Sequence, residues 1–591
     1  MNASDDDRAA AAPHASDADA EWEELLDFAA GGAGGPVTLW ELTGRIRLHS
    51  DTHIGSADDT ARGAADIAPL DRDPATGRPR LRATTLAGLL RHHLAERLGD
   101  DRAGAVAELF GEAAPRSAET GTGASLPSAL DIDDAFAELP AEAGVAVRAG
   151  NRVDPGTGAA APGATWRMET LPAGTAFTLT MRLQVAEGDR EGRLLALAAL
   201  AADGLAGAGT GPGVSIGART ARGYGAAVCE GWHIRRHDLG TPRGWADWYA
   251  LTWHQRLDRA HRAVAARSCA PSGEGGTALS ALVSGHLEDA PALAAAVGGD
   301  YARTLDEHGT DNRCRDELAM TLCLAERPTE AVLAPAGSEA APPRPGLLLV
   351  GEAPGLESLG EVDRAHLRRP AVGGDGAVQW RPTLGDTALF ALFKRMGRRL
   401  VRDISGESGA AVEEWPRDSA ARRMHARWWG GDADAQGTPQ ASAIRLRRTA
   451  ELTGGTPQRT TRVTIDALFG DSVDASLLTD DVHAGGRAEV VLDVPDPDDA
   501  VRGLLALIVR ELRTVPMDAL GGGTGAGHGR VTVTGARLTR RGPGGDARPV
   551  DLVAAVDDPG GADRAAAEPW LAALHDRLAP GPDGPRSGAR P

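Results

Sequence analysis

An internal repeat is the feature that most constrains this chain. Residues 216–225 read IGARTARGYG and residues 520–529 read LGGGTGAGHG. The two segments align without a gap as an apolar residue followed by GxxTxxGxG. A duplicated segment of this kind predicts two domains of the same design within one polypeptide.

Three further pairs of segments recur in the same order. LPAGTAFTLTMRL (171–183) aligns with VHAGGRAEVVLDV (482–494), and the alternation of apolar and polar residues in each predicts a half-buried strand after a glycine turn. Residues 192–205 and 498–512 have the apolar spacing of a helix with one buried face. Before them, Phe110-Gly111 precedes SALDI (128–132), and Trp429-Gly430 precedes SAIRL (442–446).

Each copy also opens with a strand followed by a helix. The expected strands are 37–50 and 346–353, and the expected helices are 84–98 and 383–400, the first of them capped by Thr84 or Thr85. The order is strand, helix, strands, helix, glycine loop, strand. It predicts an α+β protein with two tandem ferredoxin-like or RRM-like domains.

The domain plan follows from these segments and from composition. We expect an acidic flexible tail (1–36), a first domain (37–240), a helical region and linker (241–345), a second domain (346–540) and a flexible C-terminal tail (541–591). Trp245, Trp248 and Trp253 fall in the helical region. We interpret them as packing against a domain rather than stacking on bases.

Charge and composition exclude several classes of function. The 591 residues have a formal net charge of −20, which argues against non-specific binding of nucleic acid. However, residues 364–402 hold nine Lys and Arg against Asp375 and Asp386, so a local basic surface is expected. The four cysteines lack zinc spacing. No apolar run is long enough for a membrane span, and the acidic start is unlike a secretory signal, so we expect a cytoplasmic protein.

The first copy resembles a known family in several motifs. HIGSADDTARGAADIAPLDRDPATGRPRLRATTLAGLLR is followed by LFG, NRVDPGTGAA, LPAGTAF and IGARTARGYG. This succession over residues 37–235 is similar to RAMP proteins of type III CRISPR effectors, especially the repeated backbone subunit. The second copy, 346–540, is similar in RVTIDALFG and its glycine block, but it lacks His-Ile-Gly and departs from the family pattern in its opening.

The resemblance implies contacts with RNA. Glycines allow backbone N–H groups to approach phosphates closely, and both glycine blocks follow a helix and precede a strand, unlike a dinucleotide-binding fingerprint. The start of the helix at Thr84 and Thr85 is a second phosphate site, with Arg82 or Arg91 in place of the family's usual lysine. Arg219 and Arg222 would add charge, and Tyr224 would stack on a base. A structural turn, solvated arginines and a core tyrosine are the alternatives. The expected RNA-binding residues are His53, Thr84, Thr85, Arg91, Gly217, Arg219, Arg222, Gly223, Tyr224, Gly225, Gly521, Thr524, Gly527, Gly529 and Arg530.

The resemblance also implies metal-dependent cleavage of target RNA by a loop aspartate. By position this residue is Asp66 in the first copy and Asp363 in the second, each as catalytic residue and ligand of Mg²⁺ or Mn²⁺. Asp58, Asp59, Asp71 and Asp73 are neighbouring candidates. His53 is favoured for loop shape or RNA contact over general base chemistry.

The expected function is therefore a backbone subunit that binds guide RNA and positions target RNA, acting as an endoribonuclease in antiviral defence. Its partners would be guide RNA, target RNA and other effector subunits, including a polymerase-like large subunit. A non-catalytic RNA-binding scaffold is the first alternative. A guide-processing ribonuclease is the second, and His528 is the candidate base for it.

Overall fold

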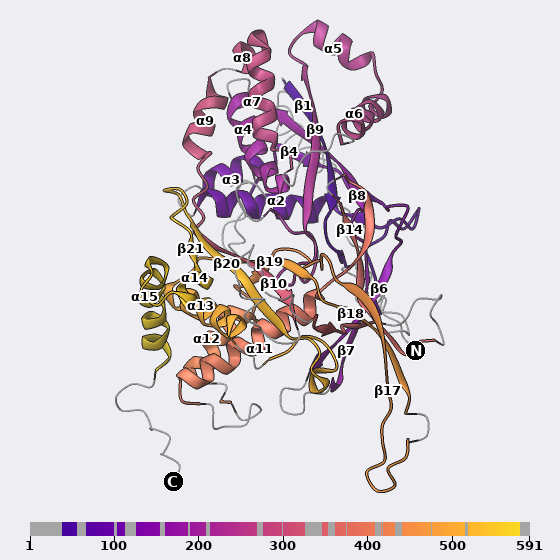
Figure 1. Ribbon diagram of the computed structural model, residues 1–591. Coiled ribbons are helices and arrows are strands. Elements are labelled where there is room, and N and C mark those ends of the chain that lie inside the picture. The colour runs from indigo at the N-terminus through magenta and orange to yellow at the C-terminus, as the bar shows by residue number, and fades with distance from the viewer. Residues whose placement is uncertain are drawn as a thin grey trace, which may run out of the picture.

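A computed structural model describes the fold (Figure 1). It describes residues 38–55, 67–99, 103–112, 126–153, 160–186, 190–207, 213–268, 276–297, 299–325, 345–352, 361–373, 375–407, 415–416, 418–431, 440–473, 476–514 and 518–579. The expected acidic tail, residues 1–36, lies outside these ranges. None of the described helices is long and apolar enough to cross a membrane.

The first half contains an antiparallel sheet of the expected design. Strand β1 (Thr38–Leu48) pairs with β8 (Ala176–Val185) and β9 (Ala227–Asp238), and β4 (Leu130–Ile132) pairs with β8. The core order is β4-β8-β1-β9, extended at one edge by β5 (Ala135–Glu138) and β3 (Arg80–Leu81). Helices α2 (Ala83–Leu98), α3 (Ala103–Phe110) and α4 (Glu191–Ala202) cover one face, because Leu90, Leu94 and Leu195 are buried among the apolar side chains of β1 and β8.

The second half repeats this order. Strand β10 (Arg315–Leu324) pairs with β19 (Arg487–Pro495) and β20 (Val531–Arg541), and β16 (Arg445–Leu446) pairs with β19. The order β16-β19-β10-β20 matches β4-β8-β1-β9 strand for strand. Helices α11 (Asp386–Ile404) and α13 (Asp499–Arg513) occupy the chain positions of α2 and α4. In Figure 1 the first half lies above the second.

The opening of the second sheet differs from the expectation. Its central strand is β10, which lies inside the region 241–345 that was expected to be helices and linker. The segment 346–353 forms only β11 (Leu347–Leu348) and β12 (Gly351–Glu352), which belong to a different sheet with β18 (Leu478–Ala484) and β13 (Arg364–His366). The second unit therefore begins at β10, before residue 346. In the sequence, residues 326–344 lie between this first strand and the loop at 349–351 that follows it.

Local details of the two sheets also agree. The register of β1 against β9 shifts between Arg45 and Ile46, beside Gly231, and that of β10 against β20 shifts between Thr321 and Leu322, beside Gly535. These are β-bulges at equivalent places, with the extra residue on β9 (Glu230) and on β20 (Thr534), and they bend these two strands in the same way. Ser128 donates from its hydroxyl to the carbonyl oxygen of Leu130 at 2.8 Å, and Ser442 does the same to Ile444 at 2.6 Å.

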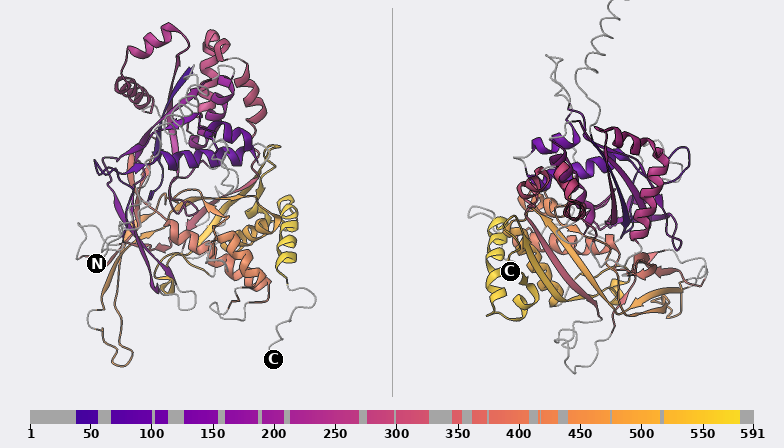
Figure 2. Two further views of the ribbon diagram at one scale, coloured as in Figure 1. Left: turned by 180° about the vertical axis from the view of Figure 1, so that it is seen from behind. Right: turned by 90° about the horizontal axis from the view of Figure 1, so that it is seen from above.

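The region after β9 is helical, but much of it belongs to the first core. Helices α7 (Leu279–Asp289), α8 (Pro291–Val297) and α9 (Asp300–His308) bury Leu279, Val297 and Tyr301 in the first hydrophobic core. Helices α5 (Pro242–Tyr249) and α6 (Trp253–Ser268) lie on the opposite face of the sheet, against β1 and β9. Figure 2 shows these two groups of helices on opposite sides of the sheet.

The segment after residue 541 is not a flexible tail as far as residue 579. Strand β21 (Val550–Asp551) pairs with β20, and it leads into α14 (Leu552–Asp557) and α15 (Ala562–Leu578). Trp570, Leu574 and Leu578 of α15 are buried in the second hydrophobic core, where α15 packs against α13. Their spacing of four residues places them on one helical face, which is why the segment folds despite its Ala-rich composition.

Candidate nucleic-acid interface

The two glycine blocks close by the same backbone hydrogen bonds. Ile216 N–H donates to the Gly225 carbonyl oxygen at 2.8 Å, and Leu520 N–H donates to that of Gly529 at 2.8 Å. A Cβ at Gly225 would lie 2.0 Å from the Ile216 oxygen, and one at Gly529 would lie 1.8 Å from the Leu520 oxygen. Both closing glycines also have positive φ, 78° and 75°. The last glycine of each block is therefore required by the loop geometry.

Each block also binds the backbone of one preceding loop. Ala218 N–H donates to the His53 carbonyl oxygen at 2.9 Å, and Gly522 N–H donates to that of Leu349 at 2.7 Å. Leu349-Val350-Gly351 thus occupies the place of His53-Ile54-Gly55, although the sequence alone did not align them. The His53 side chain is buried and its Nδ1 lies 2.7 Å from the Glu169 carbonyl oxygen. The His53 side chain therefore stabilises the conformation of its loop.

The first glycine block lies at the junction between the two halves. Ala221 accepts a hydrogen bond from Leu446 N–H at 2.9 Å, and a Cβ at Gly223 would meet the Arg448 backbone at 2.9 Å. Arg222 lies over the Phe390 ring at 6.0 Å, and burial lowers its pKa. Tyr224 is 4% exposed, and burial raises its pKa. Burial contradicts the expected base stacking by Tyr224 and makes Arg222 a junction residue.

A buried charged cluster surrounds Tyr224 at this junction. Asp51 forms ion pairs with Arg148 at 2.7 Å and with Arg369 at 3.2 Å, so the cluster joins the first sheet region to β14 (Arg368–Val372) of the second half. Asp386 at the start of α11 lies in the same cluster, and burial raises its pKa to about 7. The first half is thus attached to the second by both backbone and buried charges.

Arg219 has a different environment. Its guanidinium lies 3.4 Å from the centre of the Trp166 ring, its φ is 61°, and burial lowers its pKa to about 10. Gly217 and Ala218 beside it are exposed. In the first block, Gly217 and Ala218 are exposed, Arg219 to Arg222 are half-buried, and Gly223 to Gly225 are buried, so the opening part is the most accessible to a ligand.

The second glycine block is more open. Gly521, Thr524, Gly525 and Ala526 are exposed, and no atom lies within 4 Å of a Cβ built at Gly525 or Gly527. Arg530 follows the block and is partly exposed. His528 beneath the loop has its pKa lowered by burial and by Arg462 and Arg364, with Asp480 opposing. The N–H groups of Gly522 and of Ala526 to Gly529 donate within the protein. The exposed backbone at Thr524 and Gly525, with Arg530 following, is therefore the part that a phosphate chain can approach closely.

The start of α2 differs from the expectation. The helix begins at Ala83 with Arg82 as N-cap, and neither Thr84 nor Thr85 caps it. Ala83 N–H donates instead to the Asp134 carboxylate at 2.7 Å, which occupies part of the expected phosphate site. Arg82 is held by Asp71, with Nη2 to Oδ1 at 2.8 Å, and this contact lowers the pKa of Asp71. Arg91 is exposed on α2.

The two candidate catalytic aspartates have equivalent places in the chain. Asp66 lies outside the described residues, but it directly precedes β2 (Ile67–Ala68), which pairs in parallel with β7 (Ala160–Thr170). Asp363 directly precedes β13, which pairs in parallel with β18. Asp363 is exposed, and its Oδ2 accepts a hydrogen bond from Thr479 N–H at 2.7 Å. That bond fixes the carboxylate on β18.

Arginines surround Asp363. Arg364 is paired with Asp480 at 2.7 Å, and its Nη1 lies 3.9 Å from a Cβ built at Gly522 of the second glycine block. Arg462 contacts Asp480 at 3.6 Å, and Arg459 contacts Asp481 at 2.9 Å. The expected basic surface of residues 364–402 is largely paired in the same way, as in the contact of Arg395 with Asp518 at 2.7 Å.

Two hairpins beside these sites were not expected to carry function. Strands β6 (Ala146–Val153) and β7 form one, and β17 (Thr456–Arg462) and β18 form the other, which projects from the molecule in Figure 1. The first three residues of the family-like segment NRVDP end β6, and the rest of it lies outside the described residues. RVTID begins at the last residue of β17 and continues into the turn of the second hairpin. Leu468 and Phe469 on the second tip are 83% and 80% exposed. The sequence feature that could have indicated a functional hairpin is the apolar run Ala467-Leu468-Phe469, which is unusual in a loop.

The described residues contain no group of three or more His, Cys, Asp or Glu side chains that could hold a metal ion. Asp363 supplies one carboxylate, and its Oδ2 is bound to the β18 backbone. A single carboxylate fits Mg²⁺ or Mn²⁺ only together with water and substrate phosphates, which is a common arrangement for Mg²⁺. The donor set is therefore compatible with a metal brought in with RNA.

The sheet order and glycine loop define the first half as a ferredoxin-like α+β domain. Residues 45–228 match the model of the RAMP superfamily. The chain therefore contains a RAMP domain, which indicates a CRISPR-associated, RNA-binding role. No curated protein is significantly similar to the chain.

Proposed function

We propose that the chain is a type III CRISPR effector backbone subunit in which two RAMP units bind guide RNA and position target RNA. The observation that carries the proposal is the repetition of one site. Each half has a glycine block bound to a preceding loop, an aspartate before a short parallel strand, and a hairpin whose first strand ends in a family-like segment. A site repeated along one chain suits a ligand that is itself a repeating polymer.

The junction supports assembly with further subunits. The first glycine block contacts β16 of the second half, which is a head-to-tail contact rather than a symmetric one. The same two surfaces remain at the ends: the second glycine block is exposed, and Ile132, the β4 equivalent of Leu446, is partly exposed. Head-to-tail contacts continue rather than close, so each end is suited to another RAMP-like subunit.

The chemistry around Asp363 supports contact with a phosphate chain. Arg364, Arg459 and Arg462 are held by carboxylates at a partly exposed surface. RNA phosphates would exchange with these carboxylates as ligands of the guanidinium groups. The expected partners are guide RNA and complementary target RNA.

Asp66 and Asp363 are the proposed cleavage residues. Attack of a 2′-hydroxyl on the neighbouring phosphate breaks the P–O5′ bond and leaves a 2′,3′-cyclic phosphate and a 5′-hydroxyl. A divalent ion on the carboxylate would stabilise the developing charge. Asp363 itself would hold that ion in register with β18, since Thr479 N–H fixes its carboxylate.

The test is target cleavage by the guide-loaded protein. Asp66→Ala should lower cleavage at one position by roughly 10²-fold or more, which is about 2.7 kcal/mol of transition-state stabilisation. Asp363→Ala should remove a second cut displaced along the guide. Binding of guide and target should change little in both variants, because neither carboxylate attracts RNA.

Asp375→Ala is the matched control, since this exposed aspartate also lies in a loop of the second half. Product lengths and end groups on a sequencing gel, with Mg²⁺ or Mn²⁺ and then with chelator, give the result. Unchanged cleavage in the double variant would leave only the scaffold function. Loss of guide precursor processing in His528→Ala would favour the processing ribonuclease instead.

A further inference from the structure

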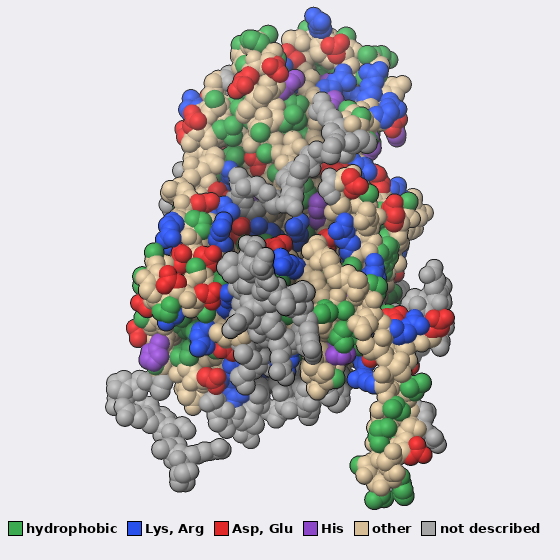
Figure 3. Space-filling view, in the orientation of Figure 1, with side chains coloured by type: hydrophobic (Ala, Val, Ile, Leu, Met, Phe, Trp, Pro, Cys, Tyr) green, Lys and Arg blue, Asp and Glu red, His purple; other side chains and the backbone are tan. Residues whose placement is uncertain are grey.

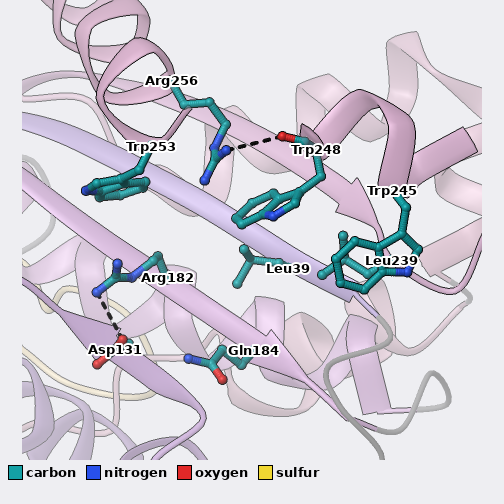
Figure 4. Close-up of a pocket in the computed structure, with 9 residues that line it drawn as sticks. All are labelled: Leu39, Asp131, Arg182, Gln184, Leu239, Trp245, Trp248, Trp253 and Arg256. Carbon is teal, nitrogen blue, oxygen red and sulfur yellow. Dashed lines mark hydrogen bonds and ion pairs between the residues drawn. The ribbon is translucent and has the colours of Figure 1, made fainter. Parts of the chain in front are cut away.

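A tryptophan-lined pocket lies at the end of the first sheet opposite the glycine blocks. Helices α5 and α6 fold back over β1, β8 and β9 and border an open pocket of about 420 Å³ (Figure 4). Leu39 of β1 lies in the pocket, whereas the loop after Leu48 binds the glycine block. Nine strand residues at about 3.3 Å each separate the two places by roughly 30 Å.

The walls of the pocket are held in place. Arg256 lies over the Trp248 ring at 3.6 Å and 5.6 Å from the Trp253 ring. It also donates to Glu41 at 2.8 Å and to the Leu251 carbonyl oxygen at 2.7 Å, so it is buried with its charge paired. Trp248 and Trp253 therefore pack against the first domain, as expected for tryptophans of this region.

The exposed side of the short helix α5 is different. Trp245, which lines the pocket, is 53% exposed, and Tyr249, which follows four residues later on the helix and does not line the pocket, is 91% exposed. Neither ring contributes to the hydrophobic cores. Large aromatic side chains left in water on one surface indicate an interaction site.

The positive charge of α5 and α6 indicates the chemical class of ligand that this surface would bind. Residues 242–266 contain four arginines and two aspartates in a chain of net charge −20. Arg243, Arg259 and Arg262 are exposed, and none of the three forms an ion pair with another described residue. Figure 3 shows cationic side chains gathered over this end of the molecule. Exposed arginines on α5 and α6, the two helices that carry the tryptophans of the pocket, suit a polyanion with flat bases.

Polar groups at the floor of the pocket match the edge of a base. Arg182 lies 5.0 Å from the Trp253 ring and is paired with Asp131 at 3.0 Å, and Gln184 is exposed beside it. Together they offer donors and acceptors beneath an aromatic wall, as Figure 4 shows. This combination of stacking and edge contacts is how proteins bind unpaired nucleotides of RNA.

We infer that this pocket binds unpaired nucleotides of single-stranded RNA, with Trp245 and Tyr249 stacking on bases and Arg259 and Arg262 on the phosphates. The site is separate from the glycine blocks. This inference depends on the proposed function in one respect only, namely that the ligand of the protein is RNA. It gives the chain a second RNA contact, outside the guide path along the repeated sites.

The probe is a fluorescein-labelled oligoribonucleotide of roughly 15 nucleotides, unrelated to the guide, added to the guide-loaded full chain. Trp245→Ala with Tyr249→Ala should raise its Kd by at least about fivefold, the lower value for loss of one stacked base. Trp245→Phe with Tyr249→Phe should retain most of the affinity, because the rings remain. Leu139→Ala, an exposed apolar residue elsewhere, is the control.

The arginines have a separate readout. Arg259→Ala with Arg262→Ala should flatten the salt dependence of oligonucleotide binding by about 1.4, from about 0.7 for each phosphate contact on a single strand. Arg510→Ala, an exposed arginine of α13, should leave it unchanged. Photocrosslinking of thiouridine-containing RNA should label the peptide that contains Trp245 and Tyr249.

Several results would overturn the inference: equal Kd values for the alanine pair and the wild-type chain, crosslinks confined to the glycine blocks, or loss of a protein partner with RNA binding unchanged. The last result would make the surface a protein interface. Guide retention is measured in parallel. If the chain never retains guide RNA, the proposed function fails, and the same oligonucleotide assay on the full chain without guide still decides the pocket.

Discussion

Gly529→Ala and Gly527→Ala separate two reasons for glycine in the second glycine block. Both residues have positive φ, 75° and 89°, so an alanine at either place is strained by about 1–2 kcal/mol. Only at Gly529 does the new Cβ collide, 1.8 Å from the Leu520 carbonyl oxygen, whereas nothing lies within 4 Å at Gly527. The difference between the variants therefore isolates the collision.

The size of that difference follows from two hydrogen bonds. Gly529 accepts from Leu520 N–H at 2.8 Å and donates to the Leu347 carbonyl oxygen at 2.7 Å. Moving the backbone away from the collision weakens both, at about 0.5–1.5 kcal/mol each. Gly529→Ala should thus destabilise by about 2–5 kcal/mol and Gly527→Ala by about 1–2 kcal/mol. Urea unfolding followed by tryptophan fluorescence measures both.

Gly525→Ala is the third variant, and it tests RNA binding rather than stability. Gly525 is exposed, its φ is not positive, and an added Cβ meets nothing within 4 Å. Stability should change by less than about 1 kcal/mol, as for an ordinary surface substitution. If RNA phosphates approach this backbone closely, guide affinity should nevertheless fall. Equal destabilisation at Gly527 and Gly529 would refute the collision argument.

Other substitutions test the fold and the junction. Asp386→Asn should remove a pH dependence: the raised pKa means that the folded state favours the protonated acid, so wild-type stability should fall as pH rises from about 4 to about 7 and then level, as thermal midpoints would record. Trp570→Ala should cost about 3–5 kcal/mol in unfolding experiments, because α15 belongs to the core; a negligible loss would restore the flexible-tail interpretation. Arg222→Ala should lower the thermal midpoint without changing the salt dependence of RNA binding, since the side chain lies at the junction over Phe390.

Local patterns predicted local structure well. The alternation in 176–185 and the helical spacing in 499–513 depend only on neighbouring residues, and both elements lie where the sequence placed them. Strand β10 was not predicted from the sequence because residues 326–344 separate it from the loop at 349–351, whereas β1 in the first half is directly followed by its loop. Helix α15 was missed because Ala-rich composition outweighed the spacing of its three large apolar residues.

The candidate site was less predictable for a different reason. Tyr224 and Arg222 read as RNA contacts because glycine loops usually carry accessible side chains, yet the second half covers them. Contacts between segments 168 residues apart, such as that of Arg222 with Phe390, leave no periodic signal. The equivalence of Leu349 with His53 likewise became visible only through the hydrogen bonds that both loops accept.

One pair of contacts bears on how the chain folds. Arg182 of β8 is paired with Asp133 at 2.8 Å, whereas the equivalent residues of the second half have opposite signs, Asp493 of β19 and Arg447 at 2.5 Å. Two similar sheets in one polypeptide can exchange strands while they form. Pairing β4 with β19 would place Asp133 against Asp493, and pairing β16 with β8 would place Arg447 against Arg182. Like charges facing each other across a strand pair are destabilising, so each sheet selects its own edge strand.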